Sequence, residues 1–385
     1  MPPSKRLLPE HVLEEIDAFN LAASQGTPIP DLIKQFGEKW KREYGSRGEK
    51  LLLRLLGTLQ ARADSVVISY TAQQAVALVT GANKVLEKQF TPTVGIITAL
   101  PKEFAAVECL LGDPHEVMKR GRRYTQGTIP AAGGNHAVVL VLLPDMGNNM
   151  ATSRATLLTE HYPDIDIIMT GIAGGVPHPE DVEHHVRLGD IVVSNRNGVV
   201  QYDNLKSERK EDIVVDTVRA APRPPSAFLL EAVRHLDARI LRAPPPWYPL
   251  IDRACPLLKC ARPADATDVL HHTHRRAEIV PHPQDERREP GRPLLFQGPI
   301  AAANILLKDP VRRDNLRAVH KVKAVEMEGS GVADATWLSG NGYLVVRGIC
   351  DYCDMSKGDA WQQYAAIVAA AYTVALIASM PIPSA

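Results

Sequence analysis

The sequence predicts an α/β protein, with a three-layer α/β/α domain preceded by a small all-α domain. After residue 93, short β-branched apolar runs alternate with segments of helical periodicity. That alternation is typical of a largely parallel sheet covered by helices on both faces. Residues 1–90, in contrast, show helical periodicity with almost no strand signal.

The first part of the chain predicts a small helical bundle. The stretches DLIKQFGEKWKREYG, EKLLLRLLGTLQARA and TAQQAVALVTGANKVLEKQ place apolar residues three and four positions apart. A linker is expected around FTPT, and no constellation of catalytic residues precedes it. We therefore expect residues 1–90 to mediate self-association or to dock a protein partner.

The second domain is expected over residues 91–385. Five runs predict buried strands: TVGIITAL, HAVVLVLL, IDIIMTGIAGG, LGDIVVSN and GYLVVRGIC. Four stretches predict helices between and after them: PKEFAAVECLLG, NMATSRATLLTEHY, GSGVADATWLSGNG and AWQQYAAIVAAAYTVALIASM. Residues 204–293 interrupt this pattern with a segment rich in Pro, Arg, Asp and His, in which PSAFLLEAVRHLDARIL predicts one helix within otherwise irregular chain. An insert of this length is usually functional or mobile.

Bulk composition limits the function classes. The 385 residues carry no formal net charge and are 45% apolar, so nucleic acid and membrane surfaces are not expected partners. The sequence contains no run of 18 apolar residues, so we expect no transmembrane helix. The N-terminus lacks the apolar stretch of a secretory signal, and the five cysteines are an odd number, so we expect reduced thiols and a cytoplasmic protein.

Carboxylates follow several of the predicted strands. Glu103 comes after TVGIITAL, Glu326 and Glu328 lie in AVEMEG, and Asp351 follows GYLVVRGIC. Ligands of an open α/β sheet bind beyond the carboxyl ends of its strands, so these acids are expected to share one pocket. Such a cluster suits cleavage of a glycosidic bond, where acids protonate the leaving group, activate water and bind sugar hydroxyls. It could instead hold Mg²⁺.

The ordered motifs VGIITALPKE, LPDMGNNMA, TGIAGG, LGDIVVS, GPIAAANILLKD, AVEMEG and VVRGICD resemble the nucleoside phosphorylase/nucleosidase superfamily. Within it, the chain is most similar to methylthioadenosine/S-adenosylhomocysteine nucleosidases. It also resembles nucleosidase-like domains fused to helical adaptor modules in bacterial defence and signalling proteins. The resemblance covers about three quarters of the chain and leaves residues 1–90 unexplained.

The resemblance implies a role for each acid. Glu103 matches the acid that activates the attacking water, and Asp351 matches the acid that protonates the purine at N7. Glu328 matches the residue that binds the ribose 2′ and 3′ hydroxyls. Met327 would pack against the sugar, and Glu326 would support its neighbours through hydrogen bonds.

Four further positions are implied to contact substrate. Gly174 and Gly175 would let the backbone approach the base or the sugar, and Gly298 and Ile300, in FQGPIAA, fall where the family lines the base pocket.

Hydrolysis is favoured over phosphorolysis by two departures from the family pattern. Met169 stands where many phosphorylases carry a phosphate-binding Arg, and Ile172 replaces a Ser or Thr. The resemblance thus implies a homo-oligomeric purine nucleosidase, acting on a nucleoside or nucleotide without metal or other cofactor, and suited to an effector role in antiviral defence through nucleotide depletion. The alternatives are a phosphate-dependent purine nucleoside phosphorylase and a non-catalytic nucleotide-sensing module.

Overall fold

The computed structural model describes residues 90–210, 213–219, 223–355 and 358–382. Thr91–Ala385 forms one compact unit. The helical bundle predicted for residues 1–90 lies outside the described residues.

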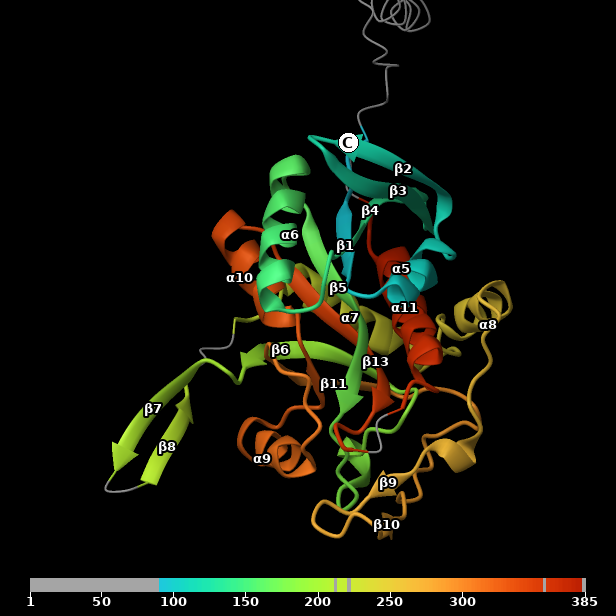
Figure 1. Ribbon diagram of the computed structural model, residues 1–385. Coiled ribbons are helices and arrows are strands. Elements are labelled where there is room, and N and C mark those ends of the chain that lie inside the picture. Colours follow the sequence, from blue (N-terminus) through green and yellow to red (C-terminus); the bar gives the residue numbers. More distant parts are fainter. Residues whose placement is uncertain (1–89, 211–212, 220–222, 356–357, 383–385) are drawn as a thin grey trace, which may run out of the picture. The chain divides into compact units, whose positions relative to one another are not determined.

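A nine-stranded mixed sheet forms the centre of this unit (Figure 1). Its order is β12-β11-β6-β13-β5-β1-β4-β3-β2. The strands are β1 (Val94–Thr98), β2 (Gly112–Lys119), β3 (Arg122–Ala131), β4 (Gly134–Leu142), β5 (Asp166–Gly175), β6 (Ile191–Gln201), β11 (Leu295–Ala302), β12 (Ala324–Glu326) and β13 (Tyr343–Asp351).

The parallel part of the sheet matches the prediction, and its margins do not. Strands β4, β1, β5 and β13 run parallel, whereas β2 and β3 add antiparallel strands at one edge and β6 runs antiparallel to β13. The sequence analysis missed β2, β3 and β11. The two hairpin turns that join β2 to β3 and β3 to β4 use left-handed backbone at Arg120, Gly121 and Gly133, which lets three consecutive strands pair locally.

Strand β12 closes part of the sheet into a ring. It pairs with β11 in parallel and with β5 in an antiparallel manner, through Val325 opposite Gly174. Strands β5, β13, β6, β11 and β12 therefore surround a common centre, and the carboxyl ends of β5, β12 and β13 are brought together.

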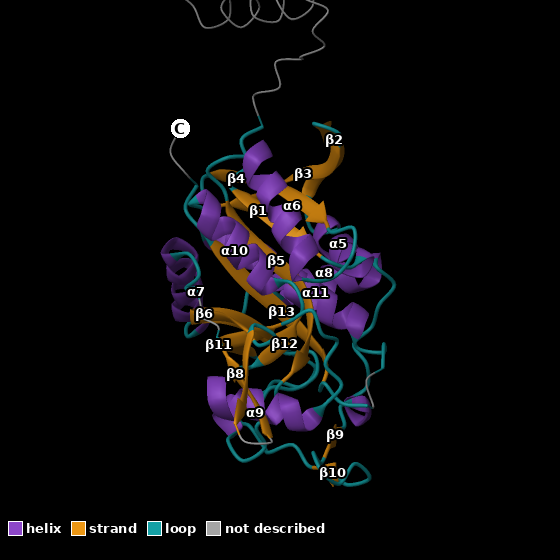
Figure 2. Ribbon diagram, turned by 60° about the vertical axis from the view of Figure 1, so that its left-hand side comes forward, coloured by secondary structure: helices purple, strands orange, loops and turns teal. Residues whose placement is uncertain are grey.

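Helices cover both faces of the sheet, which confirms the three-layer prediction (Figure 2). On one face α6 (Asn148–His161) packs against α10 (Gly329–Ser339), and α10 contacts β5, β6 and β13. On the other face α11 (Gln362–Ser379) crosses β5 and β13, with α5 (Pro101–Glu108) beside it. Helix α11 is long and apolar enough to cross a membrane by length and composition, but 78% of it is buried, so its composition is that of a core helix.

The insert holds more regular structure than the one helix predicted. It contains α7 (Ala227–Ile240), α8 (Tyr248–Leu257), the hairpin β7 (Leu205–Lys210) and β8 (Ile213–Val218), and the short pair β9 (Leu270–His271) and β10 (Ile279–Val280). Helix α7 buries Leu229, Val233 and Leu236 at helical spacing, as predicted. Helix α8 was missed because prolines mark both of its ends, although a proline in the first turn is tolerated. Helix α9 (Pro310–His320) follows β11.

Candidate active site

A cavity of about 330 Å³ lies where β1, β5, β12 and β13 end. Its size falls in the range of small-molecule sites, roughly 300–1,000 Å³. All four predicted acids line it, together with Met327 and Gly174. The remaining lining residues are Ala99, Leu100, Met146, Ile172, Ala173, Ile305, Leu306, Leu307, Lys308, Val325, Cys350, Cys353, Asp359 and Gln362.

Glu103 is held by backbone donors in the first turn of α5. Its Oε2 accepts hydrogen bonds from the N–H groups of Ala99 and Leu100, both at 2.8 Å, and its Oε1 accepts one from Ile172 at 2.7 Å. Burial raises the pKa of Glu103, while the charge of Arg347 and these backbone bonds oppose the rise. Glu103 is thus fixed in orientation between β1 and β5.

Arg347, which lies on β13, binds the other two glutamates, Glu326 and Glu328. Its Nη2 forms an ion pair with Glu326 Oε2 and lies 3.2 Å from Glu328 Oε2. The guanidinium is fully buried, and its Nη1 also donates to the carbonyl of Ile172 at 3.3 Å. A buried guanidinium is costly unless a carboxylate pairs with it. Here the carboxylates of Glu326 and Glu328 pair with Arg347 and are not arranged around a vacant metal position.

Sequence reasoning missed Arg347. It had interpreted YLVVRGIC as an ordinary buried strand. The signal was nevertheless present, because a charged residue inside a strand that is otherwise apolar must find a buried partner. The structure supplies two such partners, both from AVEMEG.

Glu326 and Glu328 differ in what they offer to a ligand. Glu326 accepts hydrogen bonds from the N–H groups of Glu328 at 3.0 Å and Gly329 at 2.9 Å, so its oxygens are occupied by backbone and by Arg347. Glu328 accepts one backbone bond, from Gly147 at 3.0 Å. Burial raises the pKa of Glu328 to about 7; the charge of Arg347 opposes this rise, and Glu326 adds to it.

Asp351 ends β13 beside a position of β5 where a residue larger than glycine would meet the following turn. Its Oδ1 accepts a hydrogen bond from the N–H of Cys353 at 2.8 Å, and its Oδ2 lies 3.1 Å from the Cys350 thiol. A Cβ on Gly174 would overlap the Cys353 sulfur and lie 2.9 Å from Asp351 Oδ1. Gly174 therefore permits the close approach of this turn to β5, as expected for a glycine at a ligand site.

Three predicted contact residues do not line the cavity. Gly175 lies one position beyond Gly174 and faces Ile349 in the ring of strands. Gly298 lies against the Lys323 side chain, and Ile300 is fully buried between β6 and β12. Segment FQGPIAA therefore builds the sheet rather than this cavity. The lining residues that come from the same region are further on, at Ile305–Lys308.

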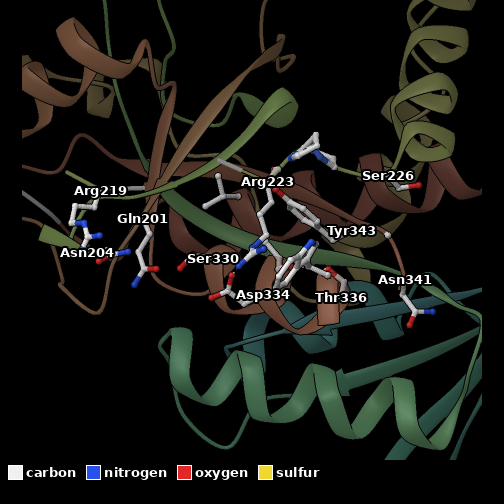
Figure 3. Close-up of a pocket in the computed structure, with 16 residues that line it drawn as sticks. Gln201, Asn204, Arg219, Arg223, Ser226, Ser330, Asp334, Thr336, Asn341 and Tyr343 are labelled. Atoms are coloured by element: carbon white, nitrogen blue, oxygen red, sulfur yellow. Dashed lines mark hydrogen bonds and ion pairs between the residues drawn. The ribbon is translucent and has the colours of Figure 1, made fainter. Parts of the chain in front are cut away.

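A second and larger cavity, of about 690 Å³, lies beside α10 (Figure 3). Its acid Asp334 is paired with Arg223 at 2.7 Å, and Arg223 lies over the ring of Trp337. None of the predicted acids lines it. The chemistry suggested by the sequence therefore belongs to the smaller cavity.

Comparison with known sequences places residues 93–378 in one family, because they match the model of the Phosphorylase superfamily. A nucleotide-binding leucine-rich repeat (NLR)-like protein of Hyaloscypha variabilis is 31% identical over 74% of this chain, and the ATP nucleosidase Cap17 of Escherichia coli is 25% identical over 74%. The chain spans 29% of the length of the first and 50% of the second. A 5′-methylthioadenosine/S-adenosylhomocysteine nucleosidase of Mycobacterium bovis is 26% identical over 75% of this chain and 97% of its own length.

Solved structures share the fold. The S-adenosylhomocysteine nucleosidase of Streptococcus pyogenes, solved with 5-methylthiotubericidin, matches with a TM-score of 0.51 and 18% identity, over 75% of this chain and 97% of its own. The sequence match over most of the chain and the shared fold agree with the motifs that first indicated the family. This chain therefore belongs to the Phosphorylase superfamily.

Proposed function

We propose that this chain hydrolyses the N-glycosidic bond of a purine nucleoside or nucleotide and releases the free base. The observation that carries the proposal is the meeting of Glu103, Glu328 and Asp351, from three separate segments, in one cavity of substrate size. The names of the relatives, which include nucleosidases of methylthioadenosine, S-adenosylhomocysteine and ATP, support the same reaction class.

Each acid has one step in the proposed reaction. Glu103 accepts a proton from the water that attacks the anomeric carbon. The bond between that carbon and N9 of the purine breaks, and its electron pair moves into the base, which Asp351 protonates at N7. Glu328 accepts hydrogen bonds from the ribose hydroxyls, and its charge stabilises the oxocarbenium-like transition state. No metal takes part, and Arg347 keeps Glu326 and Glu328 in place.

Water is the proposed nucleophile rather than phosphate. Met169 is buried inside β5 and does not line the cavity. Ile172 does line it, but its N–H is already used by Glu103. These two observations support water, with Glu103 as the proposed base, as the nucleophile.

The test is chromatographic and uses the full chain. Adenosine, methylthioadenosine, S-adenosylhomocysteine, AMP and ATP are incubated separately, with and without inorganic phosphate, beside Glu103→Gln. Free adenine that forms without phosphate and is lost in the variant is the expected result. Strict dependence on phosphate would instead identify a phosphorylase. Tight nucleotide binding without adenine would identify a sensing module.

The setting of the reaction is part of the proposal. A family domain preceded by about ninety further residues suits an effector that depletes nucleotides in antiviral defence, and the NLR-like and Cap17 relatives favour that setting. We propose a cytoplasmic homo-oligomer whose residues 1–90 contact a protein partner or a second copy.

A further inference from the structure

Tyr352 connects the cavity to the insert. Its chain neighbours Asp351 and Cys353 both line the cavity, whereas Tyr352 is buried outside it. The Tyr352 hydroxyl donates to Asp268 Oδ1 at 2.5 Å and accepts a hydrogen bond from the N–H of Leu188 at 3.3 Å. Asp268 belongs to the insert and lies two residues before β9, which lies with β10 beyond the carboxyl ends of β5 and β13 in Figure 1.

Asp268 is a buried acceptor that Arg187 and His282 also contact. Its side chain is 1% exposed, Arg187 Nε lies 2.7 Å from its Oδ2, and His282 Nε2 lies 3.4 Å from its Oδ1. Burial would raise the pKa of Asp268, but the hydrogen bonds of His282 and Tyr352 and the charge of Arg187 bring it well below the ordinary value. Burial and Asp268 raise the pKa of Tyr352 well above 10, so the phenol keeps its proton.

The backbone of Tyr352 is held as well. Arg313 Nη1 donates to the Tyr352 carbonyl at 2.8 Å, and Arg313 Nη2 donates to Thr273 Oγ1 of the insert at 3.3 Å. Arg313 is only 2% exposed. The insert is thus linked to the Tyr352 side chain through Asp268, and to the Tyr352 carbonyl through Arg313 and Thr273.

The turn held in this way sets the direction of the Asp351 carboxyl. Cys353 has left-handed backbone, with φ of 53°, and its N–H binds Asp351 Oδ1. A shift of Tyr352 moves this N–H, and the carboxyl moves with it. We infer that Tyr352 is a positioning residue, through which Asp268 of the insert orients Asp351 toward the leaving base. The inference rests on the proposed function, in which Asp351 is the general acid.

The first test separates leaving-group protonation from every other step. Tyr352→Phe removes the hydroxyl and keeps the ring. With adenosine or the preferred purine nucleoside, kcat is expected to fall about 100-fold with KM unchanged, as a misplaced general acid predicts. With p-nitrophenyl riboside, whose leaving group departs as a phenolate without a proton, kcat is expected to stay close to that of the wild type. Glu103→Gln lowers both rates.

Matched controls follow from the structure. Tyr372→Phe removes another buried hydroxyl, which has no hydrogen-bond partner among the described residues, and should leave both rates unchanged. Asp268→Asn has one acceptor oxygen for the two donors Tyr352 and Arg187, so it should lose part of the purine rate and less of it than Asp268→Ala. Asp268→Ala should match Tyr352→Phe, and the double variant should be no slower than either single variant. Equal losses on both substrates, or a purine rate unchanged by Tyr352→Phe, would overturn the inference.

A second readout needs no substrate. Hydrogen–deuterium exchange of the segment that carries the Cys353 N–H should accelerate in Tyr352→Phe, while β13 stays protected. Unchanged exchange in that segment would contradict the positioning role. If the wild type cleaves neither riboside, the proposed function fails, and exchange alone decides whether Tyr352 holds the turn.

Discussion

Arg347 is the residue on which the arrangement of the site depends. Its replacement by Met leaves Glu326 and Glu328 buried without their cation, and removing one partner of a buried ion pair costs about 3–5 kcal/mol. We expect Arg347→Met to lower the free energy of unfolding by that order, measured in urea. Arg347→Lys keeps the charge and loses the second nitrogen, which donates to the Ile172 carbonyl, so it should lose less stability than Arg347→Met. Equal stability of Arg347→Met and the wild type would contradict the proposed stabilising role of this ion pair.

Glu328 predicts a pH dependence of catalysis. Burial raises its pKa to about 7, so below this pH the carboxyl is neutral and, in the proposed reaction, accepts fewer hydrogen bonds from ribose. We expect kcat/KM to fall as the pH drops below about 7, since this ratio reports ionisations of the free enzyme. Glu328→Gln should be slow at every pH and should keep only the part of this fall that belongs to the base Glu103, whose pKa burial also raises. A wild-type profile that is flat between pH 6 and 8 would count against the assignment.

The same group predicts a pH dependence of stability. The folded-state pKa lies above the ordinary 4.5, so the contribution of Glu328 to folding is complete below about 4.5 and disappears as the pH rises through 7. The shift corresponds to a change on the order of 3 kcal/mol. Glu328→Gln should therefore be more stable than the wild type at pH 8, and this advantage should shrink toward pH 5. Melting temperatures of both proteins across that range test the sign.

At the scale of elements, the turn after β13 packs closely against β5 at Gly174. Gly174→Ala would push a methyl group into the Cys353 sulfur and against Asp351. We expect purine cleavage to fall at least tenfold while the protein stays folded, because the β5 strand itself can accept alanine. Gly174→Ala combined with Cys353→Ala removes the larger obstruction and should recover part of the rate. Full activity of Gly174→Ala would show that the turn shifts to make room for the methyl group without affecting cleavage.

Strand ends were predictable and strand partners were not. The acids at Glu103, Glu326, Glu328 and Asp351 were found because apolar runs end there, and parallel strands gather their ends at one edge. Gly298 and Ile300 lie inside β11 and outside the cavity, which motif likeness alone does not predict because it gives no strand register, and the register shifts between these two residues. Hairpin strands and α8 were missed because local turn geometry and pairing, rather than periodicity, define them.

For the whole molecule, the predicted role of residues 1–90 can be tested by deletion. A chain that begins at Thr91 should keep the cavity, because all lining residues lie between Ala99 and Gln362. If the first segment mediates assembly, size-exclusion chromatography with light scattering should give a smaller species than the full chain. If the shortened chain has the same oligomer size as the full chain, and its activity in the presence of a protein partner is also the same, residues 1–90 do not have the proposed role.

The closed ring of β5, β13, β6, β11 and β12 also has a consequence during synthesis. The acid-bearing segments leave the ribosome far apart in time, with Glu103 early and Asp351 near the end, and β12 can bridge its neighbours only after β11 has appeared. A nascent chain therefore carries no assembled site until β13 and α11 have emerged. Translation itself thus delays the onset of the proposed activity.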